Sequence, residues 1–406
     1  MSESLAVRLT KDLVKIESTD PGTYENAVKD WIKNWFLALE KHTLDTYPGL
    51  AQCTLSASLI HLTEEEVLPG RFNLMAELPG SNTAAPALVW ICHMDTVVAG
   101  TGWTLPPFGA FERDGRIYGR GSCDMKSGLA CCLSAFSYAF RRQLTSGRQP
   151  VRTLKLICTV DEEDFMRGSE GCIRSGWVAK KDWILDAEPT NGQIQVAHKG
   201  RTWYEIEVTG HTAHASTPWK GADAIAAAAE IIHSIRLDIQ NAPTHSDLGM
   251  STVTFGQVTG GYRPYVVPDT AKVWIDMRLV PPLDTAATNE IVEQAIAQAK
   301  KEVPGVTAAY TITGNRPYVE KDETSPLLEH LSEICQKVTG EKAVVSYFPG
   351  YTDTAVIAGT LDNHNCMSYG PGNLECAHQP DEWVAIEDIL RCEKVYCKMV
   401  DLLYQI

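Results

Sequence analysis

Four short apolar runs in this sequence are each followed by histidine or acidic residues, and a glycine-rich segment supplies one more aspartate. Imidazole and carboxylate groups together suit divalent ions such as zinc, manganese or cobalt. Two such ions side by side can make a bound water acidic and polarise a carbonyl group, which is the chemistry of metal-assisted hydrolysis. The candidate ligands are His93, Asp124, Glu163, Glu188 and His378.

The spacing of two pairs indicates different tasks within such a site. Glu162 and Glu163 are adjacent and point in different directions, so one can ligate an ion while the other moves protons. His93 and Asp95 are two apart and share one face of a strand. We therefore expect the Asp95 carboxylate to accept the second ring N–H of His93 and to fix its tautomer.

Taken singly, these motifs are weak. An acidic run such as 161–164 is typical of a solvated turn, and the segment 119–128 does not fit the phosphate-binding pattern GxxxxGK[ST]. Asp186 and Glu188 share a strand face, so spacing does not choose between them. The prediction depends on the whole set, because sites of open α/β sheets form beyond the carboxyl ends of strands.

The segments that carry these residues alternate between strand and helix patterns. Buried strands are predicted within 87–95, 154–164, 183–189 and 364–372, and a helix within 126–144. Two further helices are predicted at the N-terminus. The apolar stripe of the second is Val28, Trp31, Ile32, Trp35, Phe36 and Leu39. This alternation predicts an α/β domain with a mostly parallel sheet.

The middle of the chain has the order strand, helix, strand, strand, helix, strand, which is the ferredoxin-like βαββαβ pattern. We predict an inserted domain over 200–314, between the first part (1–199) and the second part (315–406) of a catalytic domain.

The net charge of −15 argues against nucleic acid and anionic membranes as partners, and no apolar stretch reaches 18 residues. The N-terminus lacks the apolar core of a secretory signal. With twelve cysteines and no CxxC pair, the composition favours a reduced, cytoplasmic protein over a disulfide scaffold or a structural zinc site.

The motifs HMDTV, GRGSCDMKSGLA, DEED, DAEPT, GHTAHAS and GPGNLECAHQPDEWV occur in this order between residues 93 and 384. Together they resemble the dinuclear-zinc aminoacylase/carboxypeptidase family, which includes acetylornithine deacetylase, succinyl-diaminopimelate desuccinylase and carboxypeptidase G. The last motif is especially similar to the acetylornithine deacetylase pattern. The resemblance implies a zinc-peptidase catalytic domain whose inserted domain serves as a lid and forms a homodimer.

For the metal centre, the resemblance implies that Asp124 bridges two ions, zinc or else cobalt or manganese. One ion would add Glu163 and His378, and the other would add His93 and Glu188, so that here Glu188 is chosen over Asp186. Asp95 would orient His93, and Glu162 would be the general base.

For the substrate site, the resemblance implies that His214 crosses a dimer interface and stabilises the oxyanion, whereas His211 is not required. Arg278 would bind a substrate carboxylate. Tyr265 stands where relatives usually have asparagine, which predicts an altered substrate preference. Gly350 and Thr352 match a loop that lines the substrate site.

These features predict hydrolysis of the amide bond of an N-acyl amino acid. A dipeptidase or carboxypeptidase would use the same catalytic residues and remains the nearest alternative. A non-catalytic binding protein on the same scaffold is the alternative from another class, but such proteins typically lose ligands or the base.

Overall fold

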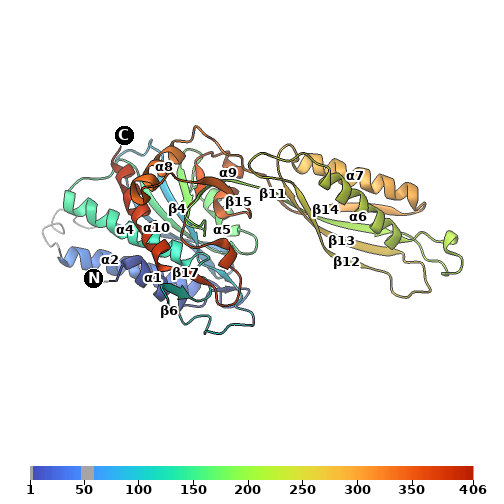
Figure 1. Cartoon of the computed structure of the whole chain (residues 1–406), viewed down its shortest axis with the longest axis horizontal. Helices are drawn as coiled ribbons and strands as arrows, with labels where there is room; N and C mark the ends of the chain where they lie inside the picture. The colour runs from blue at the N-terminus through green and yellow to red at the C-terminus, as the bar shows by residue number, and fades with distance from the viewer. Residues whose placement is uncertain (1–2, 47–58, 406) are drawn as a thin grey trace. The chain divides into compact units, whose positions relative to one another are not determined.

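The computed structural model describes residues 3–46 and 59–405, which belong to two compact units (Figure 1). Unit 1 comprises Met1–Val196, Lys321–Phe348 and Thr352–Ile406. Unit 2 comprises Ala197–Glu320 and Pro349–Tyr351. The boundaries predicted at 200 and 314 lie within a few residues of this division, whereas the return of residues 349–351 to unit 2 has no counterpart in the prediction.

Unit 1 is built on an eight-stranded mixed sheet with the order β15-β10-β16-β9-β4-β8-β3-β2. Its central strands β16, β9, β4 and β8 run parallel, and they coincide with the four buried strands predicted from the sequence. The strand bounds are β15 Val345–Phe348, β10 Ile194–His198, β16 Cys366–Ser368, β9 Trp183–Asp186, β4 Leu88–His93, β8 Leu154–Thr159, β3 Arg71–Leu78 and β2 His61–Leu68. Because β4 is buried along its whole length, it has no polar alternation.

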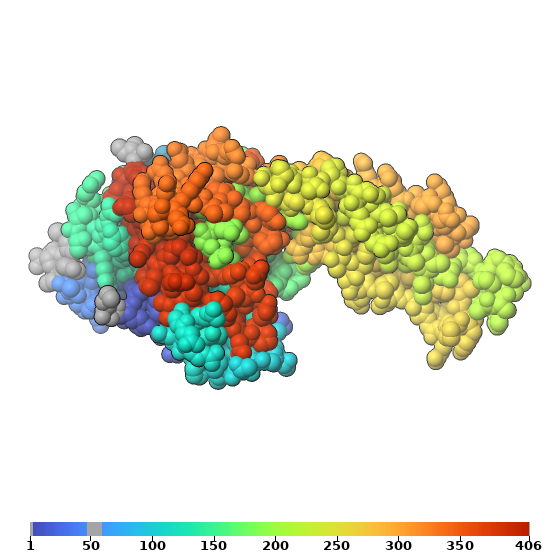
Figure 2. Space-filling model, viewed as in Figure 1, coloured from blue at the N-terminus to red at the C-terminus, as the bar shows by residue number. Residues whose placement is uncertain are grey.

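Helices α1, α4 and α10 pack on one another, and α4 also contacts β4 and β8. The helices of unit 1 are α1 Leu5–Val14, α2 Asn26–Thr46, α4 Lys126–Ser146, α5 Arg167–Arg174, α8 Pro326–Thr339, α9 Asp353–Leu361 and α10 Ile386–Met399. The orange and red segments in Figure 2 show that the last part of the chain covers much of the visible face of unit 1. No helix in the described part of the chain has the length and apolar character needed to cross a membrane.

Short elements complete unit 1 around these layers. They are β1 Thr19–Asp20, β5 Thr96–Val97, β6 Phe111–Arg113, β7 Arg116–Tyr118, η2 Leu374–Cys376, β17 Trp383–Ala385 and η3 Val400–Tyr404. β17 pairs with β7, and β7 pairs with β6, so a small three-stranded sheet joins the segment after η2 to the segment before α4. Two of the candidate ligands lie in these segments.

Unit 2 has the element order βαββαβ, with the antiparallel sheet order β12-β13-β11-β14. Its elements are β11 Gly200–Thr209, η1 Pro218–Lys220, α6 Ala224–Gln240, β12 Thr252–Gly260, β13 Thr270–Leu279, α7 Thr285–Glu302 and β14 Thr307–Arg316. Both α6 and α7 begin with an aspartate, Asp223 or Asp284, whose side chain accepts a backbone N–H of the first turn. Alternate residues of β11 and β13 pack against these helices, so the other face of the sheet is left without a helix.

Candidate metal centre and active site

All five candidate ligands belong to unit 1 and lie at the ends of parallel strands or in loops beside them. His93 is the last residue of β4, Glu163 lies in the loop after β8, and Glu188 follows β9. Asp124 lies two residues before the start of α4, and His378 lies between η2 and β17. Five segments that are distant in sequence therefore meet at the carboxyl edge of the sheet, as expected for an open α/β fold.

The carboxylate of Asp124 lies between two histidine rings. Its Oδ1 is 3.1 Å from Nε2 of His93, and its Oδ2 is 3.4 Å from Nε2 of His378. On the side of His378, Oε2 of Glu163 is 3.0 Å from the same Nε2 atom of that histidine. A carboxylate that turns one oxygen toward each of two imidazoles is suited to bridge two neighbouring ions.

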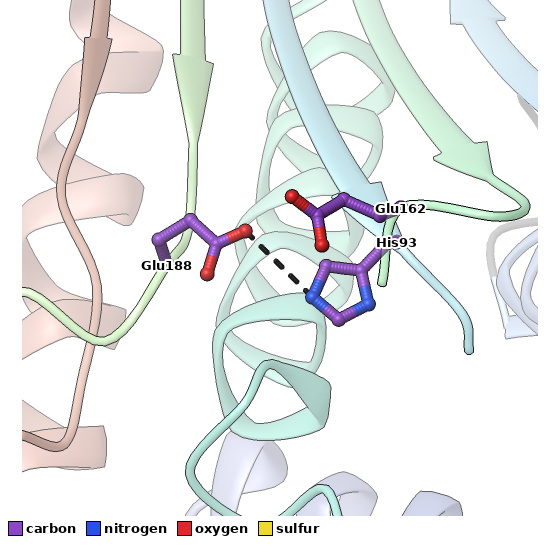
Figure 3. Close-up of side chains that lie close together, drawn as sticks. All are labelled: His93, Glu162 and Glu188. Carbon is purple, nitrogen blue, oxygen red and sulfur yellow. Dashed lines mark ion pairs between the residues drawn. The ribbon is translucent and has the colours of Figure 1, made fainter. Parts of the chain in front are cut away.

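Figure 3 shows the ring of His93 with Glu162 and Glu188 beside it. Oε1 of Glu188 is 3.7 Å from Nε2 of His93. Possible ligand atoms of these three residues lie within 4.8 Å of one another, and the same is true of His93, Asp124 and Glu163. Imidazole nitrogens and carboxylate oxygens gathered at this spacing fit divalent ions of the zinc, manganese and cobalt type.

Burial and crowding of like charges shift the protonation equilibria in this cluster. Burial raises the pKa of Glu162 and of Glu188 well above the usual value for glutamate. Hydrogen bonds to Asp124 and Glu163 raise the pKa of His378 to about 10. Neighbouring carboxylates add to the first shift and cause the second, and divalent cations would neutralise their charge.

Asp95 is placed differently from the expectation. The acceptor for Nδ1 of His93 is the backbone carbonyl oxygen of Asp95, at 2.9 Å, whereas the nearer carboxylate oxygen is 3.7 Å away. The carboxylate instead accepts the backbone N–H groups of Glu162 at 3.3 Å and Glu163 at 3.0 Å. The backbone of Asp95 is thus the nearer acceptor for the ring, and the side chain anchors the loop after β8 while it lies within ion-pair distance of the ring; that this carboxylate orients the ring stays a prediction.

The structure separates Asp186 from Glu188, which spacing alone could not do. Oδ2 of Asp186 accepts the hydroxyl of Thr354 at 2.7 Å, so this carboxylate is held by α9. Glu188 faces His93 instead. A Cβ atom on Gly370 would lie 2.2 Å from the carbonyl oxygen of Ala187 and 2.4 Å from that of Glu188, so the chain needs glycine there to approach this segment.

Glu382 supports the segment that carries the candidate ligand Asp124, although the sequence interpretation did not single it out. Its Oε1 accepts the backbone N–H groups of Cys123 at 2.8 Å and Asp124 at 3.1 Å. Its other oxygen pairs with Arg120, and both side chains are almost fully buried. Glu382 thus fixes the backbone that carries the bridging carboxylate. It lies within the motif HQPDEW, but spacing gives no sign of its contact with residues 123 and 124.

The loop after β8 is held from its other end by Arg71. This guanidinium pairs with Glu25 and lies 2.6 Å from Asp20 and 3.4 Å from Asp161. Asp161 also binds Arg167, so the first acidic residue of the run 161–164 is fully engaged in structure. Asp20 and Glu25, which form a further acidic group with Asp95, are therefore paired with an arginine. The carboxylates of the candidate metal centre differ in that they face histidines instead.

The remaining catalytic candidate, His214, belongs to unit 2 and is exposed. Its Nδ1 lies 2.8 Å from the hydroxyl of Ser216, and its backbone bridges to Val266. Tyr265 is 60% exposed, and its carbonyl oxygen accepts the N–H of Ala215 at 3.1 Å. The structure therefore brings His214 and the unusual tyrosine together on neighbouring loops.

Of the substrate-binding candidates, Arg278 is already engaged within its strand. Its Nε and Nη2 donate to the two carboxylate oxygens of Asp276 at 2.8 and 3.0 Å. Gly350 lies in the short return of the chain to unit 2. Thr352 is buried in unit 1, where its hydroxyl lies 2.9 Å from that of Thr354.

Residues 89–402 match the family model described as "Peptidase family M20/M25/M40". The chain belongs to this family. It is accordingly a metal-dependent hydrolase that acts on amide bonds, and the cluster described above contains groups of histidine and carboxylate side chains that could hold a metal ion. The resemblance expected from the motifs is thereby confirmed.

Named relatives in this family include two bacterial deacylases. A protein of Staphylococcus epidermidis named "Probable succinyl-diaminopimelate desuccinylase" is 26% identical, over 98% of this chain and 97% of its own length. An acetylornithine deacetylase of Proteus mirabilis is 30% identical, over 78% of each chain. Among solved structures, a Bacillus subtilis protein described as a dinuclear metal-binding peptidase matches with a TM-score of 0.67 at 17% identity, over 98% of each chain, and shows the shared fold.

Proposed function

We propose that the protein is a two-metal deacylase that hydrolyses the amide bond of N-acyl amino acids. The observation that carries this proposal is the position of Asp124, whose two oxygens face His93 and His378 separately. With Glu188 on one side and Glu163 on the other, the donors form two adjoining sets that share this carboxylate. Zinc fits both sets, and cobalt and manganese accept the same ligands.

Two divalent ions bound there would make a water acidic and polarise the substrate carbonyl. Glu162 lies beside His93, and its pKa is raised by burial, so it is suited to take a proton from the attacking water. The same carboxylic acid then gives the proton to the leaving amine. Glu162 also has an oxygen within 4.8 Å of possible ligand atoms of His93 and Glu188. The ion held by His93 would not need it as a ligand, because Asp124 and Glu188 would supply carboxylates there.

We further propose that unit 2 serves as a lid and as the interface of a homodimer, through which His214 reaches the site of the partner subunit. An exposed imidazole on a loop can donate a hydrogen bond to the developing oxyanion. Arg278, a third exposed, would bind a carboxylate of the substrate, and Tyr265, Gly350 and Thr352 would line its site. We place the enzyme in the cytoplasm, because the eleven cysteines that the structure describes are all free.

A dipeptidase or carboxypeptidase is the second candidate function. It is favoured by the shared fold with a dinuclear metal-binding peptidase. The chemistry at the carbonyl would be the same, and the two functions differ only in what lies on the acyl side of the bond. A binding protein without activity is disfavoured, because all five candidate ligands and Glu162 are present and lie close together.

The experiment that tests the proposal is a substrate panel run on the native, chelated and metal-restored enzyme. We expect N-acetyl or N-succinyl amino acids to be cleaved faster than dipeptides, activity to vanish on chelation, and zinc, cobalt or manganese to restore it. Elemental analysis should find two ions per chain. Faster cleavage of dipeptides would replace the deacylase by the second candidate, and activity that survives complete metal removal would contradict the two-metal mechanism.

A further inference from the structure

The loop that follows β8 and carries Glu162 begins and ends at side chains that donate to one carboxylate. Thr159 is the last residue of β8, and its hydroxyl donates to Oδ2 of Asp353 at 2.6 Å. Ser169, in the first turn of α5, donates its hydroxyl to Oδ1 of the same carboxylate. Because these two donors flank residues 160–168, Asp353 joins the two ends of the loop.

Asp353 is itself held in place, because the residue after it is bonded to another strand. The hydroxyl of Thr354 donates to Oδ2 of Asp186, the last residue of β9, at 2.7 Å. In the strand order β9-β4-β8, the two strands that residues 353 and 354 bond lie on opposite sides of β4 and are therefore about 10 Å apart. The start of α9 thus ties together the strands that flank β4, at whose end His93 lies.

These contacts are buried and consist of hydrogen bonds alone. Asp353 is 2% exposed, and Thr159, Ser169 and Thr354 are fully buried. Within residues 3–46 and 59–405, the carboxylate of Asp353 accepts these hydroxyls and forms no ion pair. Burial of a carboxylate without a counter-charge costs free energy, so the tie is not one that stability alone would favour. The carboxylate of Asp95 holds the middle of the loop, and Asp353 adds its two ends.

We propose that Asp353 is a positioning residue, which fixes the loop 160–168 so that the Glu162 carboxylate stays beside the ring of His93. Ligand atoms of Glu162, His93 and Glu188 lie within 4.8 Å of one another, as Figure 3 shows. A general base must lie within hydrogen-bond reach of the proton that it takes, and a displacement of about 1 Å can lower a rate about 10²-fold. The inference rests on the proposed role of Glu162 as base, and it applies to either class of amide substrate.

Thr159→Val tests the proposal, because it removes the hydroxyl and keeps the size of the side chain. We expect kcat to fall at least about tenfold while KM changes less than about twofold and both ions remain, since no proposed ligand or substrate-binding residue is altered. Thr159→Ser keeps the hydroxyl and should recover the wild-type kcat to within about twofold. Thr43→Val in α2, which removes a buried hydroxyl bonded to the carbonyl oxygen of Leu39, is the matched control and should keep the wild-type kcat.

The same substitution in a Glu162→Ala background separates a positioning role from a structural one. If Thr159 acts through Glu162, its change to valine should lower the residual rate of this background less than about twofold, because residues that act as a unit have non-additive effects. An equal fold loss in both backgrounds, or a serine variant as slow as the valine variant, overturns the proposal. If Thr159→Val does not fold, Ser169→Ala removes the other hydroxyl, and the same expectations apply to it.

The substrate for these assays is the amide that the panel shows to be cleaved fastest, so the test does not depend on the deacylase assignment. If dipeptides are preferred, the proposed function is replaced, and the expected loss in Thr159→Val still supports the positioning role. If Glu162→Ala retains substantial activity, the base and this inference fail together. If Glu162→Ala is inactive but Thr159→Val keeps the wild-type kcat, the base stands and only the positioning role of Asp353 is overturned.

Discussion

The two units treat their buried charged groups in opposite ways. In unit 1, Asp95 accepts two backbone N–H groups, and Glu382 accepts two more while pairing with Arg120. In unit 2, Arg201 is equally buried but has no carboxylate partner in the described residues, and His214 is exposed on a loop. The first arrangement holds a geometry in advance, whereas the second leaves these two side chains without such anchoring.

This contrast indicates how the work is divided. Unit 1 contains everything needed to gather the metal ligands, because each ligand-bearing loop is anchored by hydrogen bonds within the same unit. Unit 2 instead holds a buried arginine, Arg201, that stacks on Trp203, and a histidine, His214, on an exposed loop. Substitutions in the two units should therefore fail in different ways, the first set in chemistry or metal content and the second in substrate recognition or subunit cooperation.

The largest effect is expected from Glu162→Ala in unit 1. Removal of a general acid–base lowers the rate by about 10²–10⁴. Because five other residues supply the ligands, both ions should remain, as measured by elemental analysis beside kcat. Glu341→Ala, at an exposed position of unit 1, is the control. Substantial residual turnover would rule out Glu162 as the base, and loss of an ion would reassign it as a ligand.

His214→Ala tests the claim that a residue of unit 2 acts on the partner subunit. The loss of one oxyanion donor should lower kcat by about 10²–10³ without loss of metal. Mixed dimers of this variant with Glu162→Ala should regain part of the activity, because one of their two sites would combine an intact base with an intact histidine. His211→Ala changes a nearby exposed histidine and should remain active. Mixed dimers with no more activity than their parents would mean that each chain uses its own His214.

The candidate ligands could be picked out in the sequence as neighbours because type and position coincide: each candidate follows a buried strand or precedes a long helix. The four parallel strands were predicted for the same reason, since continuous apolar runs such as residues 88–92 suit only a buried strand. The edge strand β2 was missed because its sequence HLTEEEVL is largely polar and exposed, so it has no core-facing pattern.

Other features depend on contacts between distant segments and leave no mark on local spacing. Glu382 acts by accepting backbone N–H groups of residues 123 and 124, and backbone groups have no residue type to recognise. The backbone carbonyl oxygen of Asp95, which lies nearer to the His93 ring nitrogen than the carboxylate does, could not be foreseen for the same reason. The position of Arg201 between Arg278 and Arg316 follows from strand register, which sequence periodicity fixes only to a face and not to a partner.

A smaller effect, on metal affinity, is expected from Glu382→Gln. This substitution tests whether the contacts of Glu382 hold Asp124 in place for metal binding. The amide keeps the size of the side chain but presents one acceptor oxygen instead of two, so it cannot both accept the N–H groups of Cys123 and Asp124 and pair with Arg120. Arg120, only 2% exposed, would be left as a buried charge without its partner.

We expect the affinity for the more weakly held ion to fall about 10–100-fold, as is usual when groups that orient ligands are changed, with kcat nearly normal at saturating metal. Titration of the chelated enzyme with zinc measures this directly, and Glu375→Gln, on the exposed turn before His378, is the control. Unchanged zinc affinity would mean that Asp124 is held by its other neighbours, and the contrast between the two units would then rest on Asp95 and the loop after β8 alone.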